Sequence, residues 1–176
     1  MEFKPFSKIP RLSRDCVITE KIDGTNASIT ITEDGQFLTA SRNRFITPED
    51  DNYGFSRWAH EHKEDLMKLG VGTHFGEWWG NGIQRGYDVP EKRFSLFNVM
   101  KDPSTIPSCC SLVPVLFKGP FNTENIDNAI NHLMSFGSVA APGFEDVEGV
   151  IIWHEALQGY FKKTCVDDCI PKSVKK

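Results

Sequence analysis

Apolar and polar residues alternate with a period of two along several short stretches, the pattern of strands with one buried face. The clearest is Ala-Ser-Ile-Thr-Ile-Thr at 27–32. With β-branched and aromatic enrichment as a second criterion, strands are predicted at 16–21, 27–32, 36–41, 73–80, 94–99, 112–117, 150–153 and 160–164. Because turn residues separate the first three, we predict that they form an antiparallel meander.

Two other stretches show the three- and four-residue spacing of amphipathic helices. The first covers 55–69, with Asn52 as a candidate cap and Gly70 as its stop. The second follows a cap at Asn122 or Thr123 and ends at Gly137, and its apolar stripe is typical of core packing. Many strands with two helices predict an α+β fold.

The composition fits an ordinary soluble protein. With 176 residues, the chain is predicted to be a single domain over 1–176 that needs neither disulfides nor a structural metal. It is 39% hydrophobic and 25% charged. A net charge of −4 argues against nucleic-acid binding through the whole surface but leaves room for a local basic groove.

Cysteine usage and hydropathy predict a location. Five cysteines, an odd number without regular spacing, fit reduced thiols in a cytosol better than a disulfide framework. Cys165 and Cys169 have no matching ligand pair elsewhere, so no zinc site is predicted. Neither a signal peptide nor a run long enough to cross a bilayer is visible. We therefore expect a cytoplasmic protein with no membrane partner.

The candidate chemistry centres on Glu-Lys-Ile-Asp-Gly-Thr-Asn at 20–26. A strand that ends at Lys21 and is followed by a tight turn would hold the lysine amine still against a phosphate. The same Asp-Gly, between two β-branched runs, is also a strong hairpin signal and needs no chemistry. This stretch alone leaves both interpretations open.

Two further features suggest nucleotide contacts. Arg42 and Arg44 lie two residues apart at a predicted strand end, so they would face one side, either as a phosphate clamp or as an exposed basic end. Glu77 lies within the aromatic run at 75–79. Because acids are seldom fully buried without partners, Glu77 is predicted to meet a ribose hydroxyl, a metal or a structural arginine.

Taken in chain order, these motifs resemble the covalent nucleotidyltransferases: ATP-dependent RNA and DNA ligases and messenger RNA capping enzymes. The six stretches that are similar to that superfamily's motifs are 20–24, 41–43, 75–77, 94–99, 148–151 and 161–163. Lys-Ile-Asp-Gly-Thr-Asn and Phe-Gly-Glu-Trp are most similar to the RNA ligase 2-like group. The resemblance implies an antiparallel-rich, two-sheet, ATP-grasp-like ligase core with flanking helices and ATP between the sheets.

The resemblance also implies a role for each matching residue. Lys21 would be the nucleophile that forms lysyl-AMP, with ATP and Mg²⁺ as cofactors. The implied nucleotide contacts are Glu20 and Ile22 to adenine, partly through backbone; Phe97 stacked on adenine; Asn26 and Arg42 to the ribose-phosphate; Glu77 to a ribose hydroxyl; Glu148 to magnesium; and Lys162 to the α-phosphate, with Lys163 beside it. Whether Arg42 or Arg44 makes its contact, and what Lys163 does, stay open.

Lys21 can act as a nucleophile only after its amine has lost a proton. A lysine amine with its ordinary pKa of about 10.4 is almost wholly protonated at neutral pH, so nearby cations or a metal must make it reactive. Lys162, Lys163 and magnesium would supply that field. Only 13 residues follow Lys163, so no OB domain is expected, and the 20 residues before Lys21 favour ATP over NAD.

The predicted function is that of an ATP-dependent polynucleotide ligase that joins 3′-hydroxyl and 5′-phosphate ends, in RNA first, for RNA repair. A DNA ligase, or another nucleotidyltransferase that adenylylates ends, is the alternative enzyme. A binding module for nucleotides or nucleic acid, without turnover, is the alternative from another class. Nucleic acid would be held, by a single copy of the chain, through Arg42, Arg85, Arg93 and the lysines at 172, 175 and 176.

Overall fold

The computed structural model describes residues 1–169, so the predicted nucleic-acid contacts at 172, 175 and 176 lie outside it. Its strands are β1 (Asp15–Lys21), β2 (Thr25–Ile31), β3 (Phe37–Ser41), β4 (Phe45–Ile46), β5 (Gly72–Gly80), β6 (Lys92–Leu96), β7 (Cys110–Leu112), β8 (Val115–Pro120), β9 (Gly149–His154) and β10 (Gly159–Thr164). Its helices are α1 (Phe55–Glu61), α2 (Lys63–Leu66), α3 (Thr123–Phe136) and the 3₁₀ turns η1 (Met67–Leu69) and η2 (Pro103–Thr105).

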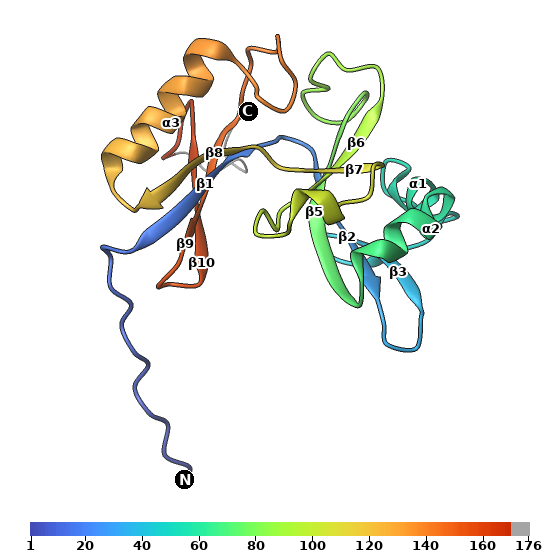
Figure 1. The fold of residues 1–176 in the computed structure, drawn as a ribbon, viewed down its shortest axis with the longest axis horizontal. Coiled ribbons are helices and arrows are strands. Elements are labelled where there is room, and N and C mark those ends of the chain that lie inside the picture. Colours follow the sequence, from blue (N-terminus) through green and yellow to red (C-terminus); the bar gives the residue numbers. More distant parts are fainter. Residues whose placement is uncertain (170–176) are drawn as a thin grey trace.

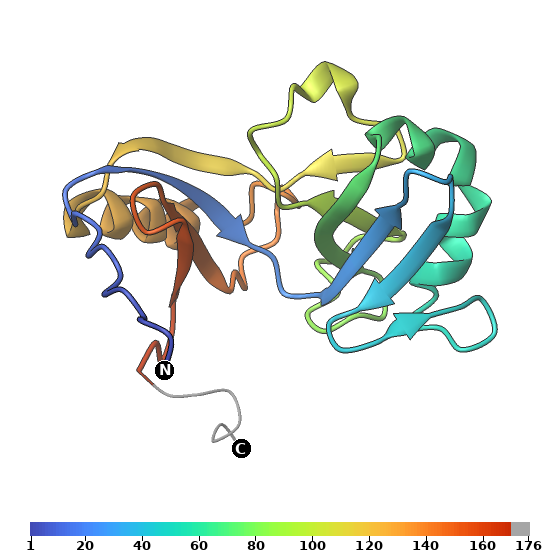
Figure 2. The same ribbon diagram turned by 90° about the horizontal axis from the view of Figure 1, so that it is seen from below.

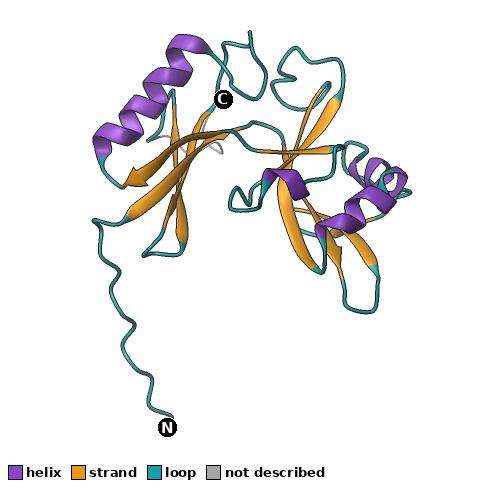
Figure 3. Cartoon of the chain, in the orientation of Figure 1, coloured by secondary structure: helices purple, strands orange, loops and turns teal. Residues whose placement is uncertain are grey.

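The strands form two sheets that lie side by side (Figures 1 and 3). The smaller has the order β10-β9-β1-β8, and all its neighbours are antiparallel. The larger has the order β4-β3-β2-β5-β6-β7, antiparallel except for the parallel pair β6–β7. Helix α3 covers the smaller sheet and α1 and α2 cover the larger one. The predicted α+β fold with two antiparallel-rich sheets and flanking helices is confirmed.

The predicted three-strand meander is wrong at its first strand. β2 and β3 pair antiparallel as expected, but β1 belongs to the other sheet. The Asp-Gly turn does not fold back, because neither Asp23 nor Gly24 has the positive φ that a type I′ hairpin needs. Instead the backbone N–H of Asp23 donates to Tyr87 Oη (2.7 Å), and that of Gly24 to Glu77 Oε1 (3.0 Å). Residues 22–24 therefore form an extended link from β1 in the smaller sheet to β2 in the larger sheet, and partners far away in the sequence hold it in place.

A second link between the two sheets, at residues 113–114, runs next to the link at residues 22–24. The predicted strand at 112–117 is two strands: β7 ends at Leu112 in the larger sheet, and β8 begins at Val115 in the smaller one. Between them, the carbonyl oxygen of Pro114 accepts from the backbone N–H of Glu20 (2.9 Å). The two links join the lobes seen in Figure 2 and fix the end of β1 between the sheets.

The helix predicted at 55–69 is divided at His62 into α1, α2 and η1. Asn52 does not cap it. The carboxylate of Asp51 accepts from the backbone N–H groups of Ser56 (2.8 Å) and Arg57 (3.0 Å) and so satisfies the first turn. Gly70, with φ 84°, ends the segment as predicted.

Helix α3 matches its prediction closely. Asn122 is the N-cap and its side chain accepts from the backbone N–H of Asn125 (2.7 Å), while Gly137 ends the helix. Within residues 1–169, no helix is long and apolar enough to cross a membrane.

Three apolar clusters hold the fold together. The first lies between the larger sheet and α1–α2, around Ile29, Phe55 and Trp78. The second lies between the smaller sheet and α3 and contains Val150. The third joins the sheets at the crossing links and contains Ile22. The relative position of the sheets therefore depends on a small core at the links.

Candidate functional site

Lys21 and Glu148 meet at the end of the smaller sheet. Lys21 is the last residue of β1 and lies opposite Gly149, the first residue of β9. Its Nζ is 2.6 Å from Glu148 Oε2, and the two side chains are 21% and 2% exposed. A Cβ at Gly149 would lie 2.1 Å from the carbonyl oxygen of Lys163. Only glycine therefore lets β9 start this close to β10 and bring Glu148 to the lysine.

Glu77 lies across the crossing link from this pair. It is on β5, where it accepts from the backbone N–H of Gly24. Burial is the main cause that raises its pKa to about 7, while the positive charge of Lys21 opposes the rise. A Cβ at Gly24 would lie 2.4 Å from the carbonyl oxygen of Trp78, so the link can pass this close to β5 only as glycine.

The β-ladder divides the motif residues between two faces of the smaller sheet. Directly opposed residues of an antiparallel pair share a face. Val150, buried under α3, lies opposite both Glu20 and Lys163, so these two residues are on the helix-covered face. Lys21 and Lys162, each one position along, are on the other face, which we call the open face.

Glu20 is fully engaged on the helix-covered face. It is 2% exposed and accepts from Ser138 Oγ (2.5 Å) and from the backbone N–H groups of Val139 and Ala140 (both 2.9 Å). Its own backbone N–H is taken by Pro114. The side chain is thus an anchor for the 138–140 loop, which leaves no side-chain role toward adenine.

Lys163 also has a partner on the helix-covered face. Its Nζ lies 2.6 Å from Asp127 Oδ1 on α3. Lys162 is exposed on the open face with Lys21. The structure thus separates the two adjacent lysines, and only Lys162 is on the side of the nucleophile.

The remaining predicted contacts are spread more widely. Asn26 lies opposite Glu77 on the neighbouring strand and shares its face. Phe97, just after β6, is partly buried against the cluster at the links. The side chain of Ile22 is 4% exposed within that cluster, so only its backbone remains for adenine. Arg42 is exposed in the turn after β3.

The predicted arginine pair is not on a strand. Arg42 and Arg44 both belong to the turn between β3 and β4, so strand alternation does not align them. Arg44 pairs with Asp50 through its guanidinium. No contact of either arginine with Lys21 is seen within residues 1–169.

From the sequence, Arg85 was assigned to nucleic-acid binding and Tyr87 was given no role. Arg85 Nε donates to Asp23 Oδ2 (3.1 Å), and the guanidinium also pairs with Asp146. Tyr87 accepts from the backbone N–H of Asp23, and burial raises its pKa. Both come from the loop after β5 and clamp the link that follows Lys21. Arg85 is therefore occupied inside the protein rather than available for nucleic acid.

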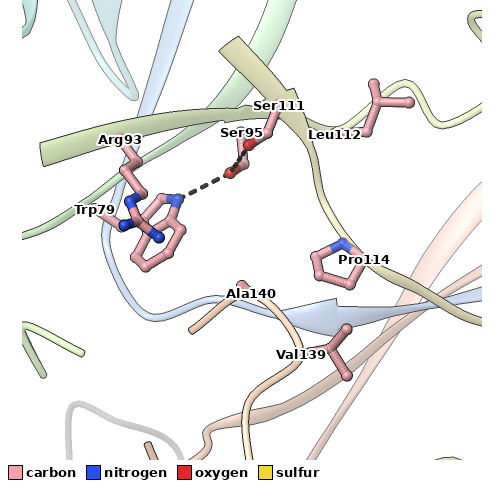
Figure 4. A pocket seen from close by; sticks show the side chains of 8 residues that line it. All are labelled: Trp79, Arg93, Ser95, Ser111, Leu112, Pro114, Val139 and Ala140. Atoms are coloured by element: carbon pink, nitrogen blue, oxygen red, sulfur yellow. Dashed lines mark hydrogen bonds between the residues drawn. The ribbon is translucent and has the colours of Figure 1, made fainter. Parts of the chain in front are cut away.

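A cavity of about 280 Å³ lies between the sheets next to this clamp (Figure 4). It is lined by Trp79, Arg93, Ser95, Ser111, Leu112, Pro114, Val139 and Ala140. Trp79 Nε1 donates to Ser95 Oγ (2.9 Å), and the Arg93 guanidinium lies over the Trp79 ring. Arg93 also pairs with Glu91. Sequence patterns gave no signal for this cavity, because its walls come from distant segments.

Metal-binding side chains are few. In the described part of the chain, no three His, Cys, Asp or Glu residues gather closely enough to hold a metal ion by themselves. Glu148 and Glu77 are two carboxylates near Lys21. Magnesium often takes one or two protein carboxylates and completes its shell with phosphate oxygens and water. The site therefore fits a metal that binds together with a nucleotide.

Comparisons with known proteins show the family and the fold of this chain. A family model described as RNA ligase matches residues 14–168. A search of the curated proteins finds no match.

Among solved structures, the fold is similar to that of variants of a Naegleria gruberi RNA ligase. One with ATP and Mn has a TM-score of 0.62 and 16% identity over 88% of this chain and 51% of that chain. One with AMP and Mn has a TM-score of 0.61 and 18% identity over 87% and 50%. Another with ATP and Mn has a TM-score of 0.60 and 18% identity over 84% and 48%.

This chain thus spans about half the length of those neighbours, and at such identities they establish the shared fold. The family match covers most of the chain, including all six motif stretches. It confirms the resemblance to RNA ligases: the chain belongs to the RNA ligase family.

Proposed function

We propose that this chain is the nucleotidyltransferase part of an ATP-dependent RNA ligase and that Lys21 carries the adenylyl group. One observation carries the proposal: Lys21 Nζ lies 2.6 Å from the buried carboxylate of Glu148, on the open face that also holds Lys162. Glu77 and Asn26 lie across the link, on the larger sheet.

In the first step, Lys21 Nζ attacks the α-phosphorus of ATP. A P–N bond forms, the P–O bond to the β-phosphate breaks, and pyrophosphate leaves. The amine must lose its proton, and Glu148 Oε2 is positioned to receive it. Lys162 would face the charge that develops on the α-phosphate, as cations do in other phosphoryl transfers.

The later steps would move AMP to a 5′-phosphate and then release it when a 3′-hydroxyl attacks. Mg²⁺ would neutralise phosphate charge when bound, and Glu148, with Glu77 nearby, would hold it. The Naegleria RNA ligase structures with ATP and Mn or with AMP and Mn support the choice of cofactors.

RNA is the proposed substrate because the family is that of the RNA ligases. DNA ends remain a second substrate to test. Work in the cytoplasm as a single copy, in the repair of RNA, belongs to the same proposal and rests on sequence patterns alone.

Sealing of a nick tests the proposal. Purified protein, ATP and magnesium are given a nicked RNA duplex and, separately, a nicked DNA duplex. We expect sealed RNA from the wild type, less sealed DNA, and none from Lys21→Ala. Equal or preferential sealing of DNA would contradict the choice of RNA. Sealing by Lys21→Ala would contradict the assigned nucleophile.

A further inference from the structure

Residues 1–14, which we call the arm, carry a concentrated positive charge. They contain four basic residues and one acid, a net charge of +3, so the rest of the chain carries −7 of the total −4. No separate stretch of the same length within residues 1–169 exceeds +2. An acidic body repels a polyanion, so the arm differs from the rest of the chain in the property that matters most for phosphate binding.

The arm also has an apolar repeat of three residues. Phe3, Phe6, Ile9 and Leu12 follow at equal spacing, interrupted by two prolines and the basic residues. Residues 1–11 form neither helix nor strand. A three-residue repeat lines one face of a polyproline II helix, which proline favours and which has three residues per turn. The arm thus presents an apolar edge with two aromatic rings beside a basic edge.

Nothing among residues 1–169 covers this apolar edge. Phe3 and Phe6 are 90% and 89% exposed, and Figures 1 and 3 show the arm extending away from both sheets. Only its root is fixed. The carbonyl oxygen of Leu12 lies 2.8 Å from His154 Nε2, and that of Arg14 accepts from the backbone N–H of Phe121 (2.8 Å).

Two of the other basic residues expected to hold nucleic acid, Arg85 and Arg93, are already paired. Arg85 binds Asp23 and Asp146, and Arg93 pairs with Glu91. For Lys4, Lys8 and Arg11 no ion pair is found among the described residues. The arm therefore offers cations that need not break a contact to meet a phosphate.

We propose that the arm binds a single-stranded part of the RNA several nucleotides away from the ends being joined, with its basic residues on phosphates and the rings of Phe3 and Phe6 stacked on bases. This inference rests on the proposed function, because the occupant is the polynucleotide that a ligase must hold. Alternating cations and aromatic rings are the combination by which proteins bind single strands without sequence preference.

The geometry sets where the arm can act. The arm leaves at Asp15, and Lys21 is at the other end of β1, about 20 Å away at roughly 3.3 Å per residue. Phosphates follow each other at about 3.4 Å along a duplex strand, so the arm begins about six nucleotides from the nucleophile. An extended arm of this length reaches about 40 Å at roughly 3.1 Å per residue. Its contacts therefore require a substrate longer than about six nucleotides on one side of the junction.

The salt dependence of binding tests the charges. Fluorescence anisotropy is used to titrate a nicked RNA duplex at several salt concentrations with the wild type and the triple variant Lys4→Gln, Lys8→Gln, Arg11→Gln. One strand of this duplex continues as a single strand from about six nucleotides beyond the nick. We expect the slope of log K against log salt to lose about two to three units, because each phosphate contact contributes about 0.7 to 0.9. The matched control removes three cations from the helical side of the larger sheet: Arg57→Gln, Lys63→Gln and Lys68→Gln. It should keep the wild-type slope.

The rings are tested by the double variant Phe3→Leu, Phe6→Leu, which keeps the apolar edge and removes the stacking surface. We expect about a tenfold loss of affinity. Phe45→Leu with Phe136→Leu, also at exposed positions, is the control and should bind as the wild type does. On a duplex with only about four nucleotides on each side of the nick, both arm variants should match the wild type, because the arm begins beyond that length.

An unchanged slope in the triple variant would overturn the proposal, and so would equal losses in the control. Sedimentation without RNA is the second readout. A dimer of the wild type that the arm variants abolish would assign the arm to a second copy of the chain and also overturn it. Adenylylation of Lys21, which uses no RNA, is measured in parallel. If even the wild type takes no AMP, the proposed function fails, and the anisotropy data still decide what the arm binds.

Discussion

The two faces of the smaller sheet carry the same residue types in neighbouring positions and use them differently. On the helix-covered face, Glu20 accepts three hydrogen bonds and Lys163 pairs with Asp127. On the open face, Lys21 meets the carboxylate of Glu148 at the end of the same strands. The first face anchors a loop and a helix, and the second presents an amine and an acid.

The difference shows how a short motif combines support with chemistry. Consecutive residues of a strand point to opposite faces, so Glu20 cannot accompany Lys21 into the site. Glu20 is satisfied by donors that the 138–140 loop provides, and this loop also lines the cavity between the sheets. The anchored acid thus fixes the strand end from which the nucleophile projects.

The largest expected effect is on the rate of adenylylation and comes from changing the acid that contacts Lys21 on the open face. Glu148→Gln removes the nearest acceptor for the Lys21 proton and also a proposed magnesium ligand, and we expect adenylylation to slow about a thousandfold. Rates with ATP labelled in its α-phosphate measure this. Glu145→Gln, an exposed acid three residues earlier, is the control and should react normally. A rate for Glu148→Gln within tenfold of the wild type would contradict the role of Glu148.

The helix-covered face should respond in stability. Glu20→Ala leaves one hydroxyl and two backbone N–H groups buried without their acceptor, so we expect the free energy of unfolding to fall by about 3 kcal/mol. Glu20→Gln keeps one oxygen acceptor and should lose about half as much. Urea unfolding of the two variants, with the exposed Glu33→Ala as control, gives the comparison. A loss below about 1 kcal/mol for Glu20→Ala would show that the anchor is not needed.

The adjacent residues Lys162 and Lys163 allow the two faces to be compared through their effects on the rate of adenylylation. Lys162→Ala should slow adenylylation about a hundredfold, because a charge that faces the phosphate is lost. Lys163→Ala should leave the rate within about twofold, since its pair with Asp127 is largely exposed and such pairs contribute less than about 1 kcal/mol. A larger effect from Lys163 than from Lys162 would reverse the assignment of faces.

The smallest expected effect concerns pH. The pKa of Glu77 is raised from 4.5 to about 7, chiefly by burial. Its contribution to stability is therefore full below about pH 4.5 and is lost as pH rises through 7. Relative to Glu77→Gln, the wild type should lose about 2 kcal/mol between pH 4.5 and 7.5, somewhat less than the full shift would give. Parallel stability curves for the two proteins would contradict the raised pKa of the partly buried Glu77.

Much of the secondary structure was predictable because it depends on local patterns of apolar and polar residues. Alternation located most strands, and the apolar stripe with Asn122 and Gly137 located α3. Which sheet a strand joins is a long-range property. Asp-Gly carries a hairpin signal, yet Tyr87 and Glu77, more than 50 residues away, hold that link open.

In the site, too, residues in local motifs were predictable and long-range contacts were not. Lys21, Glu77 and Glu148 were identified by their motifs, and the structure brings them together. The anchoring of Glu20 was missed, because backbone N–H groups exist at every non-proline residue and leave no trace in the sequence. The clamp of Arg85 on Asp23 was missed because it joins residues 62 positions apart.

The central claim is that Lys21 on the open face, and no other lysine, receives AMP. The most direct measurement is incubation with α-phosphate-labelled ATP and magnesium, followed by denaturing electrophoresis and peptide mass mapping, with Lys21→Ala and Lys163→Ala as a matched pair. We predict label on the wild type and on Lys163→Ala, in the peptide that contains Lys21, and none on Lys21→Ala. A folded, initially unmodified wild type that takes no label, or label at another residue, would contradict the account.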